Sequence, residues 1–331
     1  MKTIHVAWLN RLNVRYAGKK WKYLTFFPNL FVYSLLMNAL TILKGIWNHP
    51  FNKDHKLAAI GRFFKWQINC RLNPYDVVYP LTQNGLILAR KGMTGVTGCI
   101  YNGLLEFEDM MFLLHLLRKD DHFVDIGANV GVYSILASAE IGANTLSIEP
   151  IPSTYETLSR NLEMNVRNTS KRALNIGLGK QKGQLFFTQT LDTVNHVLPD
   201  GAQRDNAISV EIFRLDDIIK EDQLPILVKI DVEGFELEVL QGAGNILQDI
   251  RLKAIIIELN GSGERYGFKD DDVHQLLLEH GFAPHSYEPY SRQLEKLSQF
   301  GTHNTLYLRD LEFVKERILS ATRITIQHKS I

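Results

Sequence analysis

The spacing of apolar positions along the chain changes at residue 122. Beyond that point, short runs rich in Val and Ile alternate with segments whose apolar residues recur at helical intervals. Buried parallel strands read as continuous apolar runs, and the helices that join them cover both faces of the sheet. The pattern therefore predicts an α/β fold with a doubly wound, mostly parallel sheet. Its expected strands span 122–127, 145–150, 173–179, 226–234, 253–261, 282–289 and 304–310, with a β-rich insertion after the third.

The first part of the chain has a different pattern. Residues 54–73 predict an amphipathic helix that ends at the Asn73-Pro74 step, and residues 103–118 predict a second helix. Between these helices, short strands and glycine-rich turns are expected over 76–100. The apolar face of the first helix carries Leu57, Ile60, Phe64 and Ile68.

Composition limits the class of protein, and the distribution of charge divides the chain into two parts. Apolar residues make up 45% and charged residues 22% of the 331 positions, which are ordinary globular values. Two cysteines without metal-binding spacing argue against a disulfide framework or a structural zinc site, so a reducing compartment is expected. Residues 1–75 carry 12 Lys and Arg against one acid, a net charge of +11, whereas the remainder carries −10.

This charge division suggests three parts. A basic helical segment is expected over 1–75, and the main α/β domain over 76–310 with its β-rich lead-in at 76–100. A C-terminal helix or tail is expected over 311–331. The absence of a visible secretory signal predicts a cytoplasmic protein, with peripheral attachment at the inner face of the membrane as an extension of that prediction.

The apolar stretch at 25–43 has three open interpretations. It could form a helical hairpin buried against the body, a segment lying at a membrane interface, or a spanning helix. Pro28, Asn29 and Asn38 interrupt it, which disfavours the spanning helix because polar groups are costly in hydrocarbon. Peripheral membrane contact would involve residues 1–45, where aromatic and basic side chains are mixed. No nucleic-acid partner is expected, because no recognisable reader motif accompanies the charge.

Polar residues gather where the expected strands end, which is where open α/β sheets bind ligands. Four of the first five strand ends carry a carboxylate, and stability alone gives little reason to concentrate acids there. We therefore expect a ligand site at this edge. Its candidates are Asp125, Gly127, Ala128, Asn129 and Gly131 after the first strand, Glu149 and Pro150 after the second, Gly177 after the third, Asp231 and Glu233 after the fourth, and Glu258 at the end of the fifth.

The spacing of these residues favours an adenosine ligand. Glu149 lies 22 residues beyond Gly127, where nucleotide-binding folds place the acid that holds the ribose hydroxyls. Asn129 stands where the dinucleotide fingerprint needs a glycine, and Asp125 would repel a phosphate but suits a cation. An adenosine ligand with a positive ammonium and sulfonium and no phosphate is S-adenosylmethionine (SAM). The alternative is a glycine turn that only joins strand to helix, with Glu149 as a solvated acid.

Four segments resemble the successive motifs of the FkbM family of SAM-dependent methyltransferases: FVDIGANVGVYSILAS, SIEPIPSTYETLSRNLEMN, VKIDVEGFELEVLQGA and IIIELNG. The resemblance covers roughly residues 100–310. It implies a class I Rossmann-like fold with a seven-stranded sheet whose last strand is antiparallel. It also implies O-methylation, commonly of a sugar or polyketide hydroxyl. By motif match, the methionine side of the cofactor lies near Asp125, Gly127, Asn129 and Gly131, and the ribose near Glu149.

Methyl transfer to an alcohol needs alignment and a base that removes the hydroxyl proton as attack proceeds. Asp231 and Glu233 lie two residues apart in extended chain, so their side chains point the same way. We expect one to act as the base and the other to orient the cofactor or a hydroxylated small-molecule or glycan acceptor. Glu258, His303 and His196 are further candidates for the base.

Several alternatives stay open. Glu233 could simply cap the next helix. The acid cluster could hold Mg²⁺, although no third ligand is evident and no metal is expected. Glu106 and Tyr101 precede the first strand, where the chain could fold over the cofactor or merely begin a helix. A nucleotide-binding oxidoreductase, which Asn129 disfavours, and a non-catalytic membrane-associated binding protein are the alternatives to methyl transfer.

Overall fold

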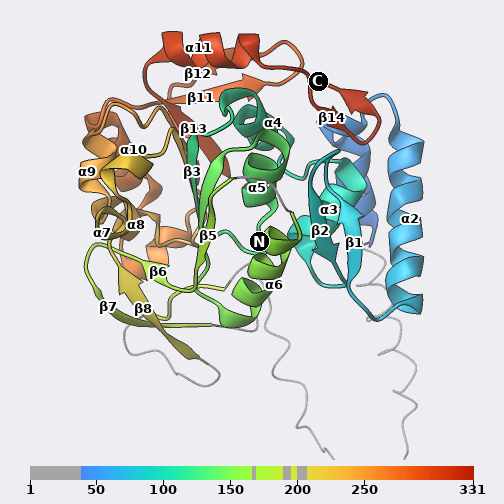
Figure 1. Ribbon diagram of the computed structural model, residues 1–331, viewed down its shortest axis with the longest axis horizontal. Helices are drawn as coiled ribbons and strands as arrows, with labels where there is room; N and C mark the ends of the chain where they lie inside the picture. The colour runs from blue at the N-terminus through green and yellow to red at the C-terminus, as the bar shows by residue number, and fades with distance from the viewer. Residues whose placement is uncertain (1–38, 166–168, 189–194, 200–206) are drawn as a thin grey trace, which may run out of the picture.

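The computed structural model describes residues 39–165, 169–188, 195–199 and 207–331 (Figure 1). Most of the apolar stretch at 25–43 lies outside the described residues, as do the basic residues that precede it, so its three interpretations stay predictions. Among the helices that the structure describes, none is long and apolar enough to cross a membrane.

The predicted α/β sheet is present and contains eight strands. From one edge to the other they are β5 (Lys171–Leu174), β4 (Asn144–Ile148), β3 (His122–Ile126), β9 (Leu227–Ile230), β10 (Ala254–Glu258), β13 (Asn304–Leu308), β11 (Ala283–Glu288) and β12 (Gln293–Lys296). The pairs from β5 to β10 are parallel, and β13 runs antiparallel to both of its neighbours. The fold class is confirmed, and β12 extends the expected seven strands by one short edge strand.

Two apolar cores lie on opposite faces of this sheet, because successive side chains of a strand point to opposite faces. In β10, Ala254 and Ile256 belong to one core, and Ile255 and Ile257 to the other. The first core also includes side chains of α4 (Phe107–Leu116), α5 (Val132–Ile135), the π-helix Leu136–Ile141 and α11 (Leu311–Ser320). The second includes side chains of α7 (Leu215–Ile218), α8 (Glu236–Gln241), α9 (Gly244–Gln248) and α10 (Asp270–Glu279).

The β-rich insertion forms a separate three-stranded sheet. Its strands are β6 (Gly177–Leu178), β8 (Ile208–Phe213) and β7 (Gly183–Phe187), in that order. The strand expected at 173–179 is therefore divided between two sheets. Asn175 lies at the division, where its side-chain amide donates to the carbonyl oxygens of Glu149 and Pro150 and turns the chain.

The described residues before α4 form an N-terminal lobe, residues 39–102. It contains a helix at 39–48, the short helix η2 (Pro50–Asn52), α2 (Lys56–Leu72), the hairpin β1 (Val77–Pro80) and β2 (Leu86–Ala89), and α3 (Thr94–Asn102). The strands and turns expected over 76–100 are thus partly wrong, because α3 begins at Thr94 and occupies the last seven of those residues. Phe51, Phe63 and Trp66 of the lobe share one core with Phe123 of β3, so apolar packing crosses the domain boundary predicted at residue 75.

Helix α2 confirms the predicted helix but not the orientation that its apolar face suggests. An amphipathic helix normally turns that face to the core. Here α2 buries Ala59, Phe63 and Trp66 instead. Most of the predicted apolar face is exposed, namely Leu57, Phe64 and Ile68. The helix therefore has apolar residues on both sides, and periodicity alone could not decide which side packs inward.

The C-terminal region, predicted as a helix or tail, contains α11 and then a hairpin that returns to the N-terminal lobe (Figure 1). This C-terminal hairpin pairs β14 (Thr325–Ile326) with β15 (Lys329–Ser330). Lys329 Nζ donates to the carbonyl oxygen of Phe51 and to the carboxylate of Asp54, each at 2.9 Å. Ile324 and Ile326 enter the core that contains Phe51. The two ends of the described chain are thus joined by packing and an ion pair.

Candidate active site

A cavity of about 340 Å³ lies at the carboxyl ends of β3, β4, β9 and β10. The chain leaves β3 for β4 on one side and reaches β9 on the other, so strand order reverses here, and open α/β sheets bind ligands at such a point. The residues predicted for cofactor binding line this cavity except Gly131, and so do Asp231, Glu233 and Glu258 among the predicted catalytic residues. The structure therefore brings these residues together at one cavity, and their roles there stay predictions.

The turn after β3 depends on three residues with positive φ: Gly127 at 73°, Asn129 at 50° and Gly131 at 90°. A Cβ at Gly127 would lie 1.8 Å from the carbonyl oxygen of Asp231, so only glycine lets the ends of β3 and β9 approach this closely. A Cβ at Gly131 would lie 2.6 Å from the Leu158 side chain. Gly131 therefore serves the packing of the turn on α6 (Pro152–Met164) rather than the cavity wall.

Glu149, just after β4, braces this turn with its carboxylate. Oε2 accepts a hydrogen bond from the backbone N–H of Asn129, and Oε1 accepts one from the N–H of Ile151, both at 3.0 Å. Burial raises the pKa of Glu149 to about 7, although the two N–H donors act in the opposite direction. Each oxygen keeps a free lone pair for a ligand donor, because a carboxylate has about four acceptor positions.

A buried polar row crosses the three central strands below the cavity. Ser147 of β4, Asp125 of β3 and Lys229 of β9 are neighbours in the strand register. Ser134 donates to Asp125 Oδ2 at 2.6 Å. The other oxygen, Asp125 Oδ1, is buried and has no hydrogen-bond partner among the described residues. Burial raises the pKa of Asp125, and the Lys229 cation acts against that shift.

Lys229 is the cavity residue that sequence reasoning missed. It is only 4% exposed, and its Nζ lies 2.9 Å from Asp231 Oδ2 and 4.9 Å from the centroid of the Tyr133 ring. Burial disfavours its charge, but the carboxylates of Asp231, Glu106 and Asp125 outweigh that effect, so the pKa of Lys229 is raised. The sequence signal for Lys229 is its charge inside the otherwise apolar run ILVKI. The apolar pattern uses this run only as evidence for a strand.

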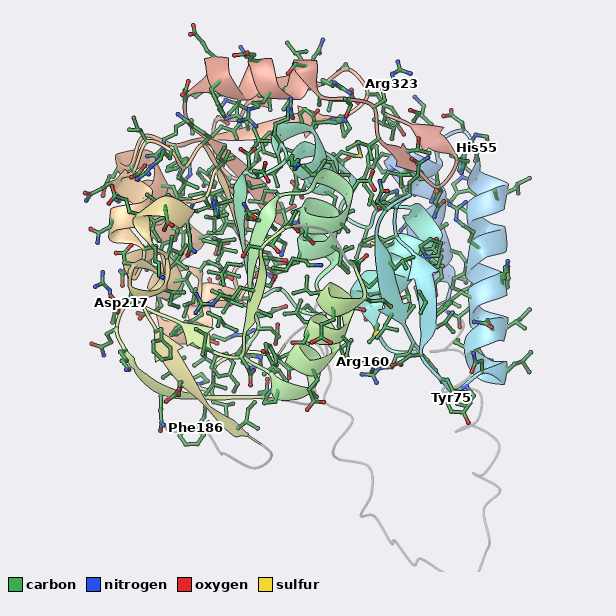
Figure 2. The ribbon with its side chains drawn as sticks, viewed as in Figure 1. His55, Tyr75, Arg160, Phe186, Asp217 and Arg323 are labelled. Carbon is green, nitrogen blue, oxygen red and sulfur yellow. The ribbon has the colours of Figure 1, made fainter. Side chains whose placement is uncertain are left out.

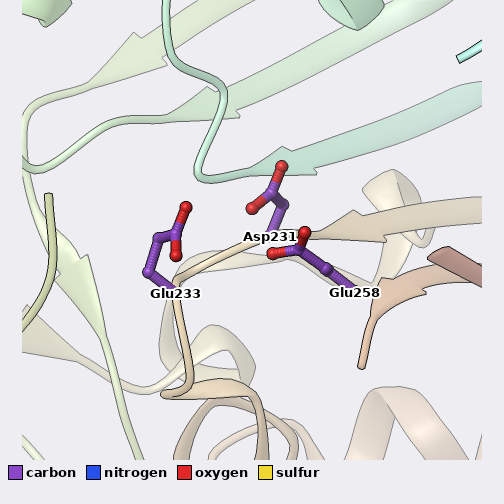
Figure 3. A group of neighbouring side chains, drawn as sticks. All are labelled: Asp231, Glu233 and Glu258. Carbon is purple, nitrogen blue, oxygen red and sulfur yellow. The ribbon is translucent and has the colours of Figure 1, made fainter. Parts of the chain in front are cut away.

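The carboxylates of Asp231, Glu233 and Glu258 form an acid cluster, in which they point toward one another (Figure 3). One ligand oxygen from each lies within 4.8 Å of the others. Burial, followed by repulsion from Asp231, raises the pKa of Glu233 to about 7 and that of Glu258 to about 8. Asp231 differs from the other two because it is ion-paired with Lys229. Glu258 also supplies the third carboxylate that was not evident from spacing.

The structure separates the remaining candidates. Glu106 lines the cavity and accepts a hydrogen bond from the Tyr133 hydroxyl at 2.6 Å. Tyr101, His196 and His303 are not among the described residues that line the cavity.

The capping role considered for Glu233 is not observed, because no side chain caps the N-terminus of α8 and Glu236 instead braces the turn before the helix. Glu236 Oε1 accepts the backbone N–H groups of Val232 and Gly234, both at 3.1 Å. Glu233 itself has a φ of 56°, and its side chain lines the cavity. The helix-cap alternative for Glu233 therefore has no support in the geometry.

These features fit a ligand with a ribose at one end and a cationic amino acid at the other. Glu149 offers free lone pairs at the end of β4, where a ribose diol would donate. The buried Asp125 Oδ1 lacks a donor, which an ammonium group in the cavity would supply. Gly127 keeps the intervening wall free of a side chain. The fold is therefore Rossmann-like, and its site suits an adenosine ligand that carries a cationic amino acid, as SAM does.

Residues 125–284 match the family model described as the methyltransferase FkbM domain. This match confirms the family resemblance over the 160 matched residues, which are just under half of the chain. It is 28% identical over 176 residues to the hexuronic acid methyltransferase AglP of Haloferax volcanii, which is 53% of this chain and 68% of that protein. It is also 28% identical over 209 residues to methyltransferase sdnD of Sordaria araneosa, covering 53% of this chain and 79% of that protein.

Solved structures with a similar arrangement are more distant. The precorrin-6y C5,15-methyltransferase of Geobacter metallireducens has a TM-score of 0.37 and 18% identity, over 70% of this chain and 98% of that chain. The magnesium protoporphyrin IX methyltransferase of Synechocystis has a TM-score of 0.37 and 13% identity, over 67% and 87% of the two chains. The strand order of the central sheet by itself defines the Rossmann-like fold.

Proposed function

We propose that this protein is a SAM-dependent O-methyltransferase whose acceptor is a hydroxyl group of a sugar, a glycan or a related natural product. One observation supports this most directly. The acid cluster of Asp231, Glu233 and Glu258 faces the same cavity as Glu149 and Asp125. The candidate base for the acceptor and the groups suited to the methyl donor thus line the same cavity.

The two ends of the donor would be held by different residues. Glu149 would accept from the ribose hydroxyls, and Asp125 from the ammonium group. When bound, SAM supplies an electrophilic methyl group with a good leaving group, so the protein contributes mainly alignment and proton removal. The buried position of Asp125 and Glu149 makes these contacts strong, because hydrogen bonds to charged groups gain from low local dielectric.

We assign the base to Glu233, with Glu258 as the second candidate. A general base works best when its pKa lies near the operating pH, and these two groups have pKa values of about 7 and about 8. One carboxylate oxygen of Asp231 is already engaged in an ion pair with the Lys229 ammonium, at 2.9 Å. Asp231 is therefore assigned to orienting the acceptor or the donor.

The acid cluster also bears on the chemistry of the acceptor. A carboxylate acceptor needs no base and would be repelled by Glu233 or Glu258 in its ionised form, whereas a hydroxyl needs a base and can donate to that form. The relative from Haloferax volcanii is named a hexuronic acid methyltransferase, and a hexuronic acid carries both groups. We propose that a hydroxyl is methylated, so the product is a methyl ether rather than a methyl ester.

The test is methyl transfer from isotope-labelled SAM to a panel of acceptors. The panel contains glucuronic acid, galacturonic acid, neutral hexoses, their short oligosaccharides and simple secondary alcohols. Mild alkali hydrolyses methyl esters and leaves methyl ethers intact. Label that survives alkali supports the proposal, and label released by alkali contradicts it.

An outcome without detectable methyl transfer is also informative in this test. If SAM binds with calorimetric heat but no acceptor in the panel takes label, the proposed acceptor class is wrong. If SAM does not bind at all, the non-catalytic alternative replaces the enzyme assignment.

A further inference from the structure

The outer side of α2 carries a continuous apolar stripe on the surface of the N-terminal lobe. Leu57, Phe64, Ile68 and Leu72 are between 53% and 80% exposed. Their spacing of seven, four and four residues places them along one line of a helix. We call this set the outer stripe of α2. The helix lies along one edge of the molecule, between the labelled His55 and Tyr75 (Figure 2).

Basic residues border this stripe. Lys65 and Arg71 are exposed and fall on its two sides, at helical angles of about 65° and about 55° from its centre line. The helix contains four basic residues and no acid. At its N-terminal end, Lys56 Nζ lies 5.0 Å from the centroid of the Trp47 ring, and that ring is 44% exposed.

We propose that the outer stripe of α2 lies flat on an anionic membrane surface, with Lys65 and Arg71 reaching the lipid head groups. Helices with an apolar stripe between basic residues bind in the interfacial plane of membranes, and nearby aromatic side chains favour the same depth. The proposal concerns attachment and is independent of the proposed methyl transfer. It also moves the expected membrane contact from residues 1–45 to a described helix.

Charge argues against two other occupants of the stripe. Residues 1–38 contain six Lys and Arg and no acid, so they carry the same sign as the borders of the stripe. A second copy of the chain would bring an identical basic face. An anionic lipid surface attracts both the stripe's borders and the preceding segment, and each Lys or Arg near such a surface strengthens binding about fivefold.

The experiment is flotation of the full-length protein with vesicles of phosphatidylcholine alone or with one-third phosphatidylserine, at low and high salt. The main variant is Phe64→Glu with Ile68→Glu. Its matched control is Ile250→Glu with Leu319→Glu, which places the same two charges on exposed apolar positions elsewhere. A second pair compares Lys65→Gln with Arg71→Gln against Lys315→Gln with Arg323→Gln. Thermal melting confirms that each variant is folded.

We expect wild type to float with anionic vesicles at low salt and to be released at high salt. The stripe variant should bind at least tenfold more weakly, because two apolar side chains no longer enter the interface. Loss of Lys65 and Arg71 together should cost roughly 30-fold. Both control variants should bind vesicles within about twofold of wild type. Their substitutions lie away from the outer stripe of α2 and change only the overall charge of the protein.

Three results would overturn the proposal. The first is no flotation of wild type. The second is equal flotation of the stripe variant and its control, which would assign any membrane contact to other residues. The third is a wild-type dimer in light scattering that becomes a monomer in the stripe variant, which would show that a second copy covers the stripe.

Discussion

Replacing Glu149 by Gln tests the cofactor site most directly. The substitution keeps the shape of the side chain but leaves one acceptor oxygen, so one of the N–H groups of Asn129 and Ile151 loses its partner. The charged contact to the ribose is lost as well. A hydrogen bond to a charged group contributes about 1.5–3 kcal/mol, which corresponds to roughly 10–150-fold in SAM affinity.

The same site makes a prediction about pH. Because burial raises the pKa of Glu149 to about 7, the ionised acceptor is nearly complete at about pH 8 and reduced to about one tenth at about pH 6. A ribose diol donates to the ionised form, so affinity should rise with pH through this range, by roughly tenfold in total. In Glu149→Gln the rise should be absent, because the amide does not titrate.

Isothermal titration calorimetry with SAM and with adenosine measures both effects. Adenosine presents the same ribose but has no group that titrates near neutral pH, so its pH dependence reports on the protein. Glu163→Gln, at an exposed position of α6, is the matched control and should leave both affinities unchanged. Wild-type affinity for adenosine that is flat with pH, or equal SAM affinity in Glu149→Gln, would remove Glu149 from the cofactor site.

Three further predictions concern the cavity. In Glu233→Gln, turnover should fall by roughly 10²–10⁴ while SAM affinity stays nearly intact, whereas Asp231→Asn should weaken binding more than turnover, as steady-state kinetics with calorimetry would show. If both variants remain folded and within about threefold of wild-type turnover, neither is catalytic, and Glu258 becomes the leading base. Lys229→Met leaves Asp231 and the buried Asp125 without their cation, so the free energy of unfolding in urea should drop by about 3–5 kcal/mol at neutral pH. That deficit should shrink in acid, because a protonated carboxyl needs no cation; a loss independent of pH would instead indicate a packing defect. Removal of divalent ions with a chelator should leave turnover unchanged, since Lys229 already neutralises Asp231; activity that disappears and returns with Mg²⁺ would show that the acid cluster is a metal site.

Residues at strand ends were predictable because two rules act together. Parallel strands read as apolar runs, and their carboxyl ends meet at one edge of the sheet. Asp125, Glu149, Asp231 and Glu258 could therefore be placed at one edge of the sheet from the sequence alone. What spacing could not supply was their mutual geometry, such as the two backbone N–H groups that Glu149 accepts.

The misses have physical reasons of their own. Lys229 was overlooked because a strand pattern counts apolar positions and does not ask where a single charge would find its partners. Helix α2 was misoriented because both of its sides are apolar, and periodicity does not say which side packs inward. The edge strand β12 has mostly exposed, polar residues, so it lacks the apolar signal that the other strands provide.

The C-terminal hairpin has a consequence for the order in which this chain folds during synthesis. A ribosome delivers the N-terminal lobe early, and N-terminal units usually fold first. Here Ile324 and Ile326 complete the core around Phe51, and Lys329 holds Phe51 and Asp54 from the other side. Those residues emerge only after the whole central sheet has been made. Until then the apolar side chains around Phe51 lack their contacts with Ile324 and Ile326, so the N-terminal lobe completes its packing only after the central sheet has been synthesised.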